Sequence, residues 1–309
     1  MITAAAANST DYLFLTGKVR ALENRMLDKF RFYRLADNAE KKTFFEDLAD
    51  SPYKDYLSEN KFGLRLKEYI YDQYLSLRNK MEEPAYLDLF MVGSDISNIV
   101  SFLRGASDES EYADGVLEEK WWQQERMPEF VKLVFDRLKK MSEVEDISIM
   151  PAAVVECACV DVVGVVILPN IKSDLALEYW KRSIDIKNFL LNKKGASKYY
   201  LSGGFISKNF WMRQDPSGEP AAKVEACPFY SRMEMHEDIA DAEFAARQWK
   251  SGIIKEMRKI AFGPEPIIAY LLSIMEESAN LLHIYTGISM GFDPADLKEG
   301  LNLAYVSRV

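Results

Sequence analysis

Apolar residues recur at three- and four-residue spacing along most of this 309-residue chain. In the first such stretch Leu15, Val19, Leu22, Met26 and Phe30 form one apolar stripe with charged residues between them, as a helix with one buried face requires. Two-residue alternation, the pattern of strands, is hard to find. The periodicity therefore predicts an all-α protein, with helices over 11–35, 62–81, 84–104, 117–141, 151–167, 174–193, 234–260 and 266–286.

Proline and glycine punctuate this pattern where helices should start or stop. Glu83-Pro84 is one such point, since proline lacks the backbone N–H and fixes φ. Segments 105–120 and 213–223 are poor in large apolar residues, and Ser202-Gly203-Gly204 reads as a turn. These three places are candidate domain boundaries.

An acid, an asparagine, a glycine and a serine recur three times with one spacing. The asparagine follows the acid by three residues, and the glycine and serine follow the asparagine by seven and nine. The copies are Asp95, Asn98, Gly105 and Ser107; Asp185, Asn188, Gly195 and Ser197; and Glu277, Asn280, Gly287 and Ser289. With 15 glycines in the whole chain, three chance matches at one offset are improbable.

The spacing of this repeat has a structural meaning. An acid and an amide three residues apart share one helix face and can bond each other or a neighbouring backbone. The glycine suits a left-handed helix C-cap, and the serine can begin the next segment. We interpret each copy as a tie between its helix and an adjacent loop; the alternative is a coincidence of helix ends.

The interval between copies, about ninety residues, is an ordinary size for a small domain. The chain is therefore predicted to contain three similar helical domains, at 1–115, 116–205 and 206–309. A triplicated body favours a pseudo-threefold arrangement.

Composition excludes some function classes. The chain carries 48 acidic and 39 basic residues, and a net charge of −9 removes the usual driving force for binding nucleic acid. Three cysteines, Cys157, Cys159 and Cys227, fit a reducing setting, with the first two expected in the core. The N-terminal residues do not resemble a secretory signal.

Two apolar stretches, 147–168 and 267–285, raise the question of a membrane. Both contain carboxylates, each of which costs roughly 3 kcal/mol near the middle of a bilayer. We interpret both as buried helices of a soluble protein.

The sequence shows no nucleophile elbow and no phosphate loop. Glu234, His236, Glu237 and Asp238 do not share one helix face and are expected at a solvated helix start, and His283 is expected in a core or interface. We therefore predict no catalytic, cofactor-binding or metal-binding residue and no small-molecule substrate. Trp121 and Trp122 are expected in the core.

Basic residues line the first helix, and two interpretations of them stay open. They face either an acidic partner or solvent. They are Lys18, Arg20, Arg25, Lys29, Arg31 and Arg34.

Three segments resemble the C-subunit family of prokaryotic V-type (A-type) ATPases, which is related to the d-subunit of eukaryotic V-type pumps. They are DYLFLTGKVRALENRML with LADSPY near the start, IDIKNFLLNKKGASKYYLSGGFIS in the middle, and FGPEPIIAYLLSIMEESANLLHIYTGISMGFDPADLKEGL at the end. The middle segment carries the family's aspartate, asparagine and glycine pair at Asp185, Asn188, Gly203 and Gly204. The chain departs from the family at 278–283, where a more basic stretch is usual, and at Lys193-Lys194, where an arginine-bearing segment is common.

The resemblance implies an all-helical funnel of three similar domains around a pseudo-threefold axis. It also implies a non-catalytic central-stalk rotor adaptor that joins the shaft subunits to the membrane proteolipid ring and transmits torque between ATP hydrolysis or synthesis and ion transport. Such a subunit lies in the cytoplasm, peripheral to the cytoplasmic membrane. A free-standing helical scaffold is the main alternative, and an enzyme with a pocket of perturbed carboxylates is another.

Overall fold

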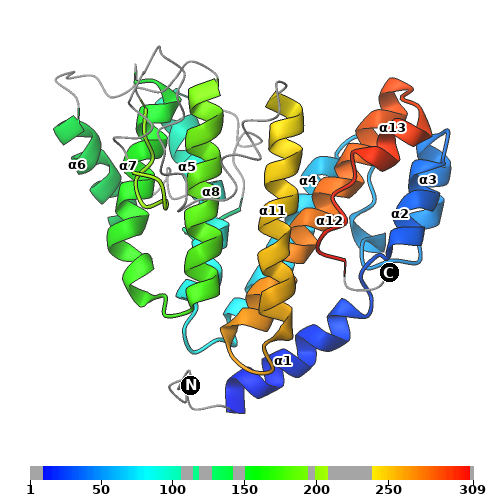
Figure 1. The fold of residues 1–309 in the computed structure, drawn as a ribbon, viewed down its shortest axis with the longest axis horizontal. Coiled ribbons are helices and arrows are strands. Elements are labelled where there is room, and N and C mark those ends of the chain that lie inside the picture. The colour runs from blue at the N-terminus through cyan, green and yellow to red at the C-terminus, as the bar shows by residue number, and fades with distance from the viewer. Residues whose placement is uncertain are drawn as a thin grey trace, which may run out of the picture. The chain divides into compact units, whose positions relative to one another are not determined.

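The computed structural model describes residues 10–105, 114–117, 127–141, 150–193, 199–207 and 239–306. Within these ranges every regular element is a helix, which confirms the predicted all-α class (Figure 1). The chain divides into two compact units. Unit 1 combines 1–87 with 251–309, and unit 2 is 88–250. The division into three domains stays a prediction.

Unit 1 is built around one long C-terminal helix, α12, which α1, α2, α3, α4 and α13 all contact. Helix α1 lies across the N-terminal end of α12 (Figure 1). The elements of unit 1 are α1 (Thr10–Glu23), α2 (Lys29–Ala36), α3 (Lys41–Leu48), a 3₁₀ turn η1 (Lys54–Tyr56), α4 (Phe62–Arg78), α12 (Pro264–Met290) and α13 (Pro294–Glu299).

The ends of α12 follow from its sequence. Pro264 stands at its start, where the N–H that proline lacks would have no helical partner. At its end Gly291 has φ +73°. There the N–H of Phe292 donates to the carbonyl of Gly287 over 3.0 Å and that of Gly291 to Ile288 over 3.2 Å. This pair of bonds is a Schellman cap, which needs a residue that tolerates positive φ.

Three described helical segments are long and apolar enough to cross a membrane by length and composition alone. They are Ala85–Leu103, Ala152–Asn170 and Pro264–Met290. In the most apolar 18-residue stretch of α12, 78% is buried inside the protein. The apolar surface of this helix therefore packs in the core of unit 1. The prediction of a buried helix at 267–285 is confirmed.

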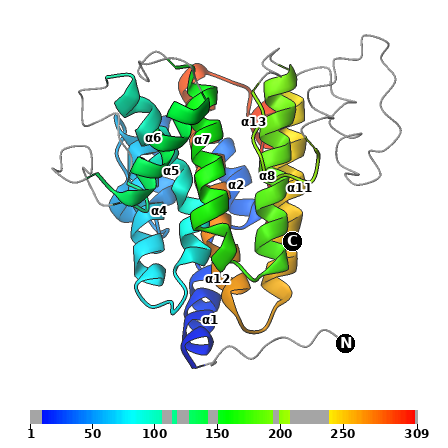
Figure 2. The same cartoon turned by 90° about the vertical axis from the view of Figure 1, so that its left-hand side faces the viewer.

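Unit 2 is a row of helices with α7 at its centre. One apolar cluster joins α7 to α5 and α6, a second joins it to α8, and a third joins α8 to α11. Figure 2 shows α5, α6 and α7 side by side. Cys157 and Cys159 are buried in α7, as predicted. The helices are α5 (Ala85–Leu103), α6 (Glu129–Met141), α7 (Ala152–Val166), a 3₁₀ turn η5 (Leu168–Asn170), α8 (Asp174–Lys193) and α11 (Ile239–Lys259). The first three residues of α5 and the part of α11 from Ser251 on belong to unit 1.

The prediction of a single helix over 11–35 is wrong, because α1 ends at Glu23 and α2 begins at Lys29. Asp28 starts the second helix by accepting the N–H of Arg31 on its carboxylate over 2.8 Å, which makes it an N-cap. The N–H of Leu27 donates instead to the distant Glu277. The apolar spacing runs on across the break, so periodicity alone gave no sign of it.

Candidate functional site: three buried acid and amide pairs

Asp185 and Asn188 lie one turn apart on α8, and both side chains are buried. Asn188 exchanges two hydrogen bonds with the backbone of Leu201: its Nδ2 donates to the carbonyl over 2.9 Å, and its Oδ1 accepts the N–H over 2.8 Å. Asp185 accepts the N–H groups of Phe205 over 2.8 Å and Ile206 over 3.2 Å. Four hydrogen bonds therefore tie α8 to the loop at its C-terminal end.

The glycine pair in this loop allows the loop backbone to come close to the Asp185 carboxylate. Gly203 has φ +90°, a conformation that side chains rarely adopt, so the predicted turn is present. At Gly204 an added Cβ would overlap the Asp185 carboxylate. Glycine is required there because the loop backbone itself is the hydrogen-bond donor and must come close to the acid.

The first copy repeats this arrangement on α5. Buried Asp95 accepts the N–H groups of Val116 over 2.7 Å and Leu117 over 3.1 Å. A Cβ at Gly115, just before these two residues, would overlap the Asp95 carboxylate. Asn98 is also buried. In both copies a carboxylate thus binds two consecutive N–H groups that come after a glycine.

In the third copy, on α12, the asparagine makes the same kind of backbone contact as in the second copy, but the acid binds a different segment of the chain. Asn280 donates from Nδ2 to the carbonyl of Asn302 over 2.8 Å and accepts its N–H over 3.1 Å, the same two-bond exchange as in the second copy. Glu277 accepts the N–H of Leu27 over 3.0 Å. The longer Glu side chain thereby ties α12 to the α1–α2 break, while the amide ties it to the C-terminal segment.

The glycines of the repeat do not share one role. Gly105, just past the end of α5, has φ +75° as a left-handed cap requires. Gly287 lies inside α12, four residues before the cap at Gly291, so its predicted cap role is wrong. A Cβ at Gly287 would overlap Leu297, so this glycine admits the side chain of α13. Gly195, Ser107 and Ser197 lie outside the described residues, and Ser289 lies within α12.

Burial raises the pKa of all three acids. The pKa of Asp95 and that of Asp185 each rise to about 6, although the backbone N–H groups they accept favour the charged form. The pKa of Glu277 rises to about 8, since burial outweighs the nearby Tyr53 hydroxyl, the Leu27 N–H and Arg258. Burial therefore favours the protonated form of all three acids, most of all that of Glu277.

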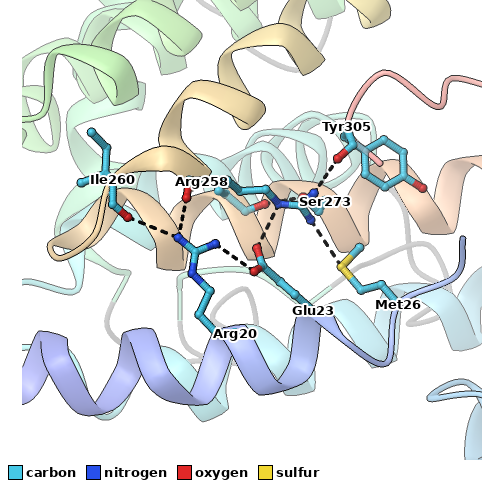
Figure 3. A network of polar contacts seen from close by, with 8 residues as sticks. Arg20, Glu23, Met26, Arg258, Ile260, Ser273 and Tyr305 are labelled. Carbon is cyan, nitrogen blue, oxygen red and sulfur yellow. Dashed lines mark hydrogen bonds and ion pairs between the residues drawn. The ribbon is translucent and has the colours of Figure 1, made fainter. Parts of the chain in front are cut away.

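A second polar network, which helical periodicity does not reveal, surrounds Arg258 near the end of α11 (Figure 3). Its Nε forms an ion pair with Oε1 of Glu23 at 2.9 Å, and its Nη1 donates to the carbonyl of Tyr305. Arg20 pairs with the other oxygen of Glu23 at 2.9 Å and also donates to the carbonyl of Ile260 over 3.2 Å. The network therefore joins α1, α11 and the C-terminal segment. The sequence did not predict this network, because nothing in the local pattern distinguishes Arg258 from the other arginines.

Several basic residues of the first helical stretch have partners within the chain. Lys18 donates to Ser76, Arg20 joins the Arg258 network, and the ammonium of Lys29 lies 5.2 Å from the ring centre of Tyr33. Arg34 pairs with Asp47 at 3.4 Å, and Arg31 donates to the carbonyl of Asp50 over 3.3 Å. Intramolecular contacts account for much of this basic face.

Among the described residues no cluster of three His, Cys, Asp or Glu side chains is placed to hold a metal ion. The Nε2 atom of His283 lies 3.1 Å from the carbonyl of Leu297. Residues 234–238, Trp121, Trp122 and Cys227 lie outside the described part of the chain.

These observations define an all-helical protein in which long helices are tied to loops and to distant segments by buried acid and amide pairs. Residues 15–159, just under half of the chain, match the model of the family described as ATP synthase (C/AC39) subunit, in agreement with the resemblance seen in the sequence. The matched segment includes the first acid and amide pair; the second and third pairs lie beyond it. A comparison with curated proteins found no match.

Proposed function

We propose that this protein is a subunit of a V/A-type ATPase and is the non-catalytic rotor adaptor of its central stalk. In this role it joins the shaft subunits to the membrane proteolipid ring on the cytoplasmic side, so that both turn together. The family match over residues 15–159 is the observation that carries the proposal. Torque then passes through the protein during ATP hydrolysis or synthesis.

The acid and amide pairs suit such a role. A body that transmits torque must resist internal shear, and packed helices alone can slide past their loops. Asn188 and Asn280 each bind the backbone N–H and carbonyl of one residue, and in both cases the side-chain amide is buried. Buried hydrogen bonds of fixed geometry cannot be exchanged for water at low cost, so they oppose this motion.

Purification of the ATPase through a tag on another of its subunits tests the proposal. We expect this chain in stoichiometric amount. Membranes from a strain without the chain should lose ATP-driven ion transport, while the soluble head keeps its ATP hydrolysis. An intact, coupled ATPase that lacks the chain would refute the adaptor role. A soluble set of partners with no ATPase subunit would favour a free-standing scaffold instead.

A further inference from the structure

A cleft of about 390 Å³ opens in unit 1 at the break between α1 and α2. The α1–α2 linker forms one wall, and the 50–54 segment and the C-terminal residues Tyr305 and Val306 form others. Leu27, the residue tethered by Glu277, belongs to the linker wall. The cleft therefore exists because the predicted long helix is interrupted.

Seven of the fourteen lining residues are charged. The cations are Arg25, Arg31, Lys54 and Arg258, and the carboxylates are Glu23, Asp28 and Asp50. Arg258 is paired with Glu23, and Asp28 is engaged as the N-cap of α2. Three cations and the carboxylate of Asp50 are left to face the opening.

Two of these cations are available to a ligand. Arg25 and Lys54 are exposed, and neither forms an ion pair with a carboxylate of the described residues. Arg31 gives one guanidinium N–H to the carbonyl of Asp50 and keeps further donors. On a chain of net charge −9, this local excess of positive charge would attract an acidic ligand that the rest of the surface repels.

We propose that this cleft binds an acidic segment of a partner protein through its side-chain carboxylates. The excess positive charge is small, and Asp28 and Asp50 lie in the same lining, which disfavours a multiply charged phosphate. Single carboxylates match the geometry of arginine, which can hold both oxygens at once. We identify the partner as another subunit of the ATPase, and this identification rests on the proposed function.

Carbodiimide coupling in the purified ATPase tests this, because the reagent joins a lysine amine to a carboxylate in direct contact. We expect mass spectrometry to find an amide between Lys54 and an Asp or Glu of another subunit. Lys54→Arg should remove this product while keeping the charge and the assembly. Lys42→Arg, at an exposed lysine of α3, is the control and should leave the Lys54 product unchanged.

Two results in an ATPase that contains the chain would overturn the inference and leave the proposed function standing. In the first, Lys54 couples only with Asp50 of its own chain; in the second, Lys54 does not couple at all. Should the chain fail to purify with the ATPase, the proposed function fails. The cleft is then tested on the free chain with a hexaglutamate peptide. Binding that falls about tenfold in Arg25→Ala/Lys54→Ala supports the inference. Binding of inorganic phosphate without the peptide, or of neither, overturns it.

Discussion

The backbone N–H of Leu27 donates a hydrogen bond to the carboxyl group of Glu277 over 3.0 Å, although the two residues are 250 positions apart. This contact lies where the apolar periodicity of 11–35 is interrupted. An N–H at a helix break has no helical partner, and the buried acid supplies one. The α1–α2 break is thus stabilised from the far end of the chain.

Glu277 should make the stability of the protein depend on pH. Its pKa rises from 4.5 to about 8 in the folded chain because the side chain is buried, so between these values the native state holds a proton that the unfolded chain has lost. Stability should therefore fall as pH rises through this window, by at most about 1.4 kcal/mol per pH unit for this one proton. Tyr53, Arg258 and Arg31 face the group and limit the effect.

The Glu277→Gln variant tests this, because glutamine keeps the acceptor for Leu27 and cannot ionise. Urea denaturation at pH 5, 6, 7 and 8 should show a flatter pH dependence than that of the natural chain. Glu299→Gln, at an exposed residue of the same unit, should leave the dependence unchanged. An equal slope for Glu277→Gln and the natural chain would show that Glu277 does not titrate in this range.

Asn188→Leu should destabilise unit 2 by roughly 1 to 3 kcal/mol, because the N–H and carbonyl of Leu201 would lose their buried partner. The measurement is chemical denaturation followed by circular dichroism. Asn192→Leu, at an exposed position of the same helix, should change stability by less than about 0.5 kcal/mol. Equal effects of the two substitutions would mean that the amide contact is dispensable.

Gly204→Ala and Gly164→Ala should have opposite effects. At Gly204 the new methyl group would overlap the Asp185 carboxylate and should cost roughly 1 to 3 kcal/mol. Gly164 lies in α7 with no atom within 4 Å of an added Cβ, so alanine there should stabilise the helix by about 0.5 to 1 kcal/mol. Thermal melts of the two variants provide the comparison.

The close approach can be isolated by a double-mutant cycle. In an Asp185→Ala background the carboxylate is gone, so Gly204→Ala should cost clearly less than it does alone. Additive effects of the two substitutions would contradict a contact between the loop backbone at Gly204 and the acid.

Arg258→Met should destabilise unit 1 by about 1 to 3 kcal/mol, because Glu23, whose side chain is 13% exposed, would lose its buried charge partner and keep only the more exposed Arg20. Lys259→Met, at the exposed neighbour whose pair with Glu256 is solvated, should cost under about 1 kcal/mol. Urea denaturation distinguishes the two. The double variant Glu23→Gln/Arg258→Met should be less damaged than the sum of its parts, and strict additivity would argue against the pairing.

The local pattern of the sequence was sufficient for the class of fold and for the bounds of several long helices. It was wrong at 117–141, where α6 begins only at Glu129, and it did not predict the short helices α3 and α13. Residues 174–193 were predicted as a helix and α8 has those limits, because an apolar stripe and a start at Ser173-Asp174 are local features. The acid and asparagine of each repeat could also be singled out, since a polar pair in an apolar helix has to be satisfied when the helix is buried. Their place on one helix face follows from three-residue spacing.

Tertiary structure decided which groups those side chains bind. Asp185 and Asp95 bind N–H groups in the loops next along the chain, whereas Glu277, in the same repeat position, binds Leu27 near the other end of the chain. Tertiary structure also decided three other features: the break in 11–35, the position of Gly287 inside α12 and the Glu23–Arg258 pair. Each depends on which segment packs against a helix, and helical periodicity records only which face is buried, not the segment that lies against it.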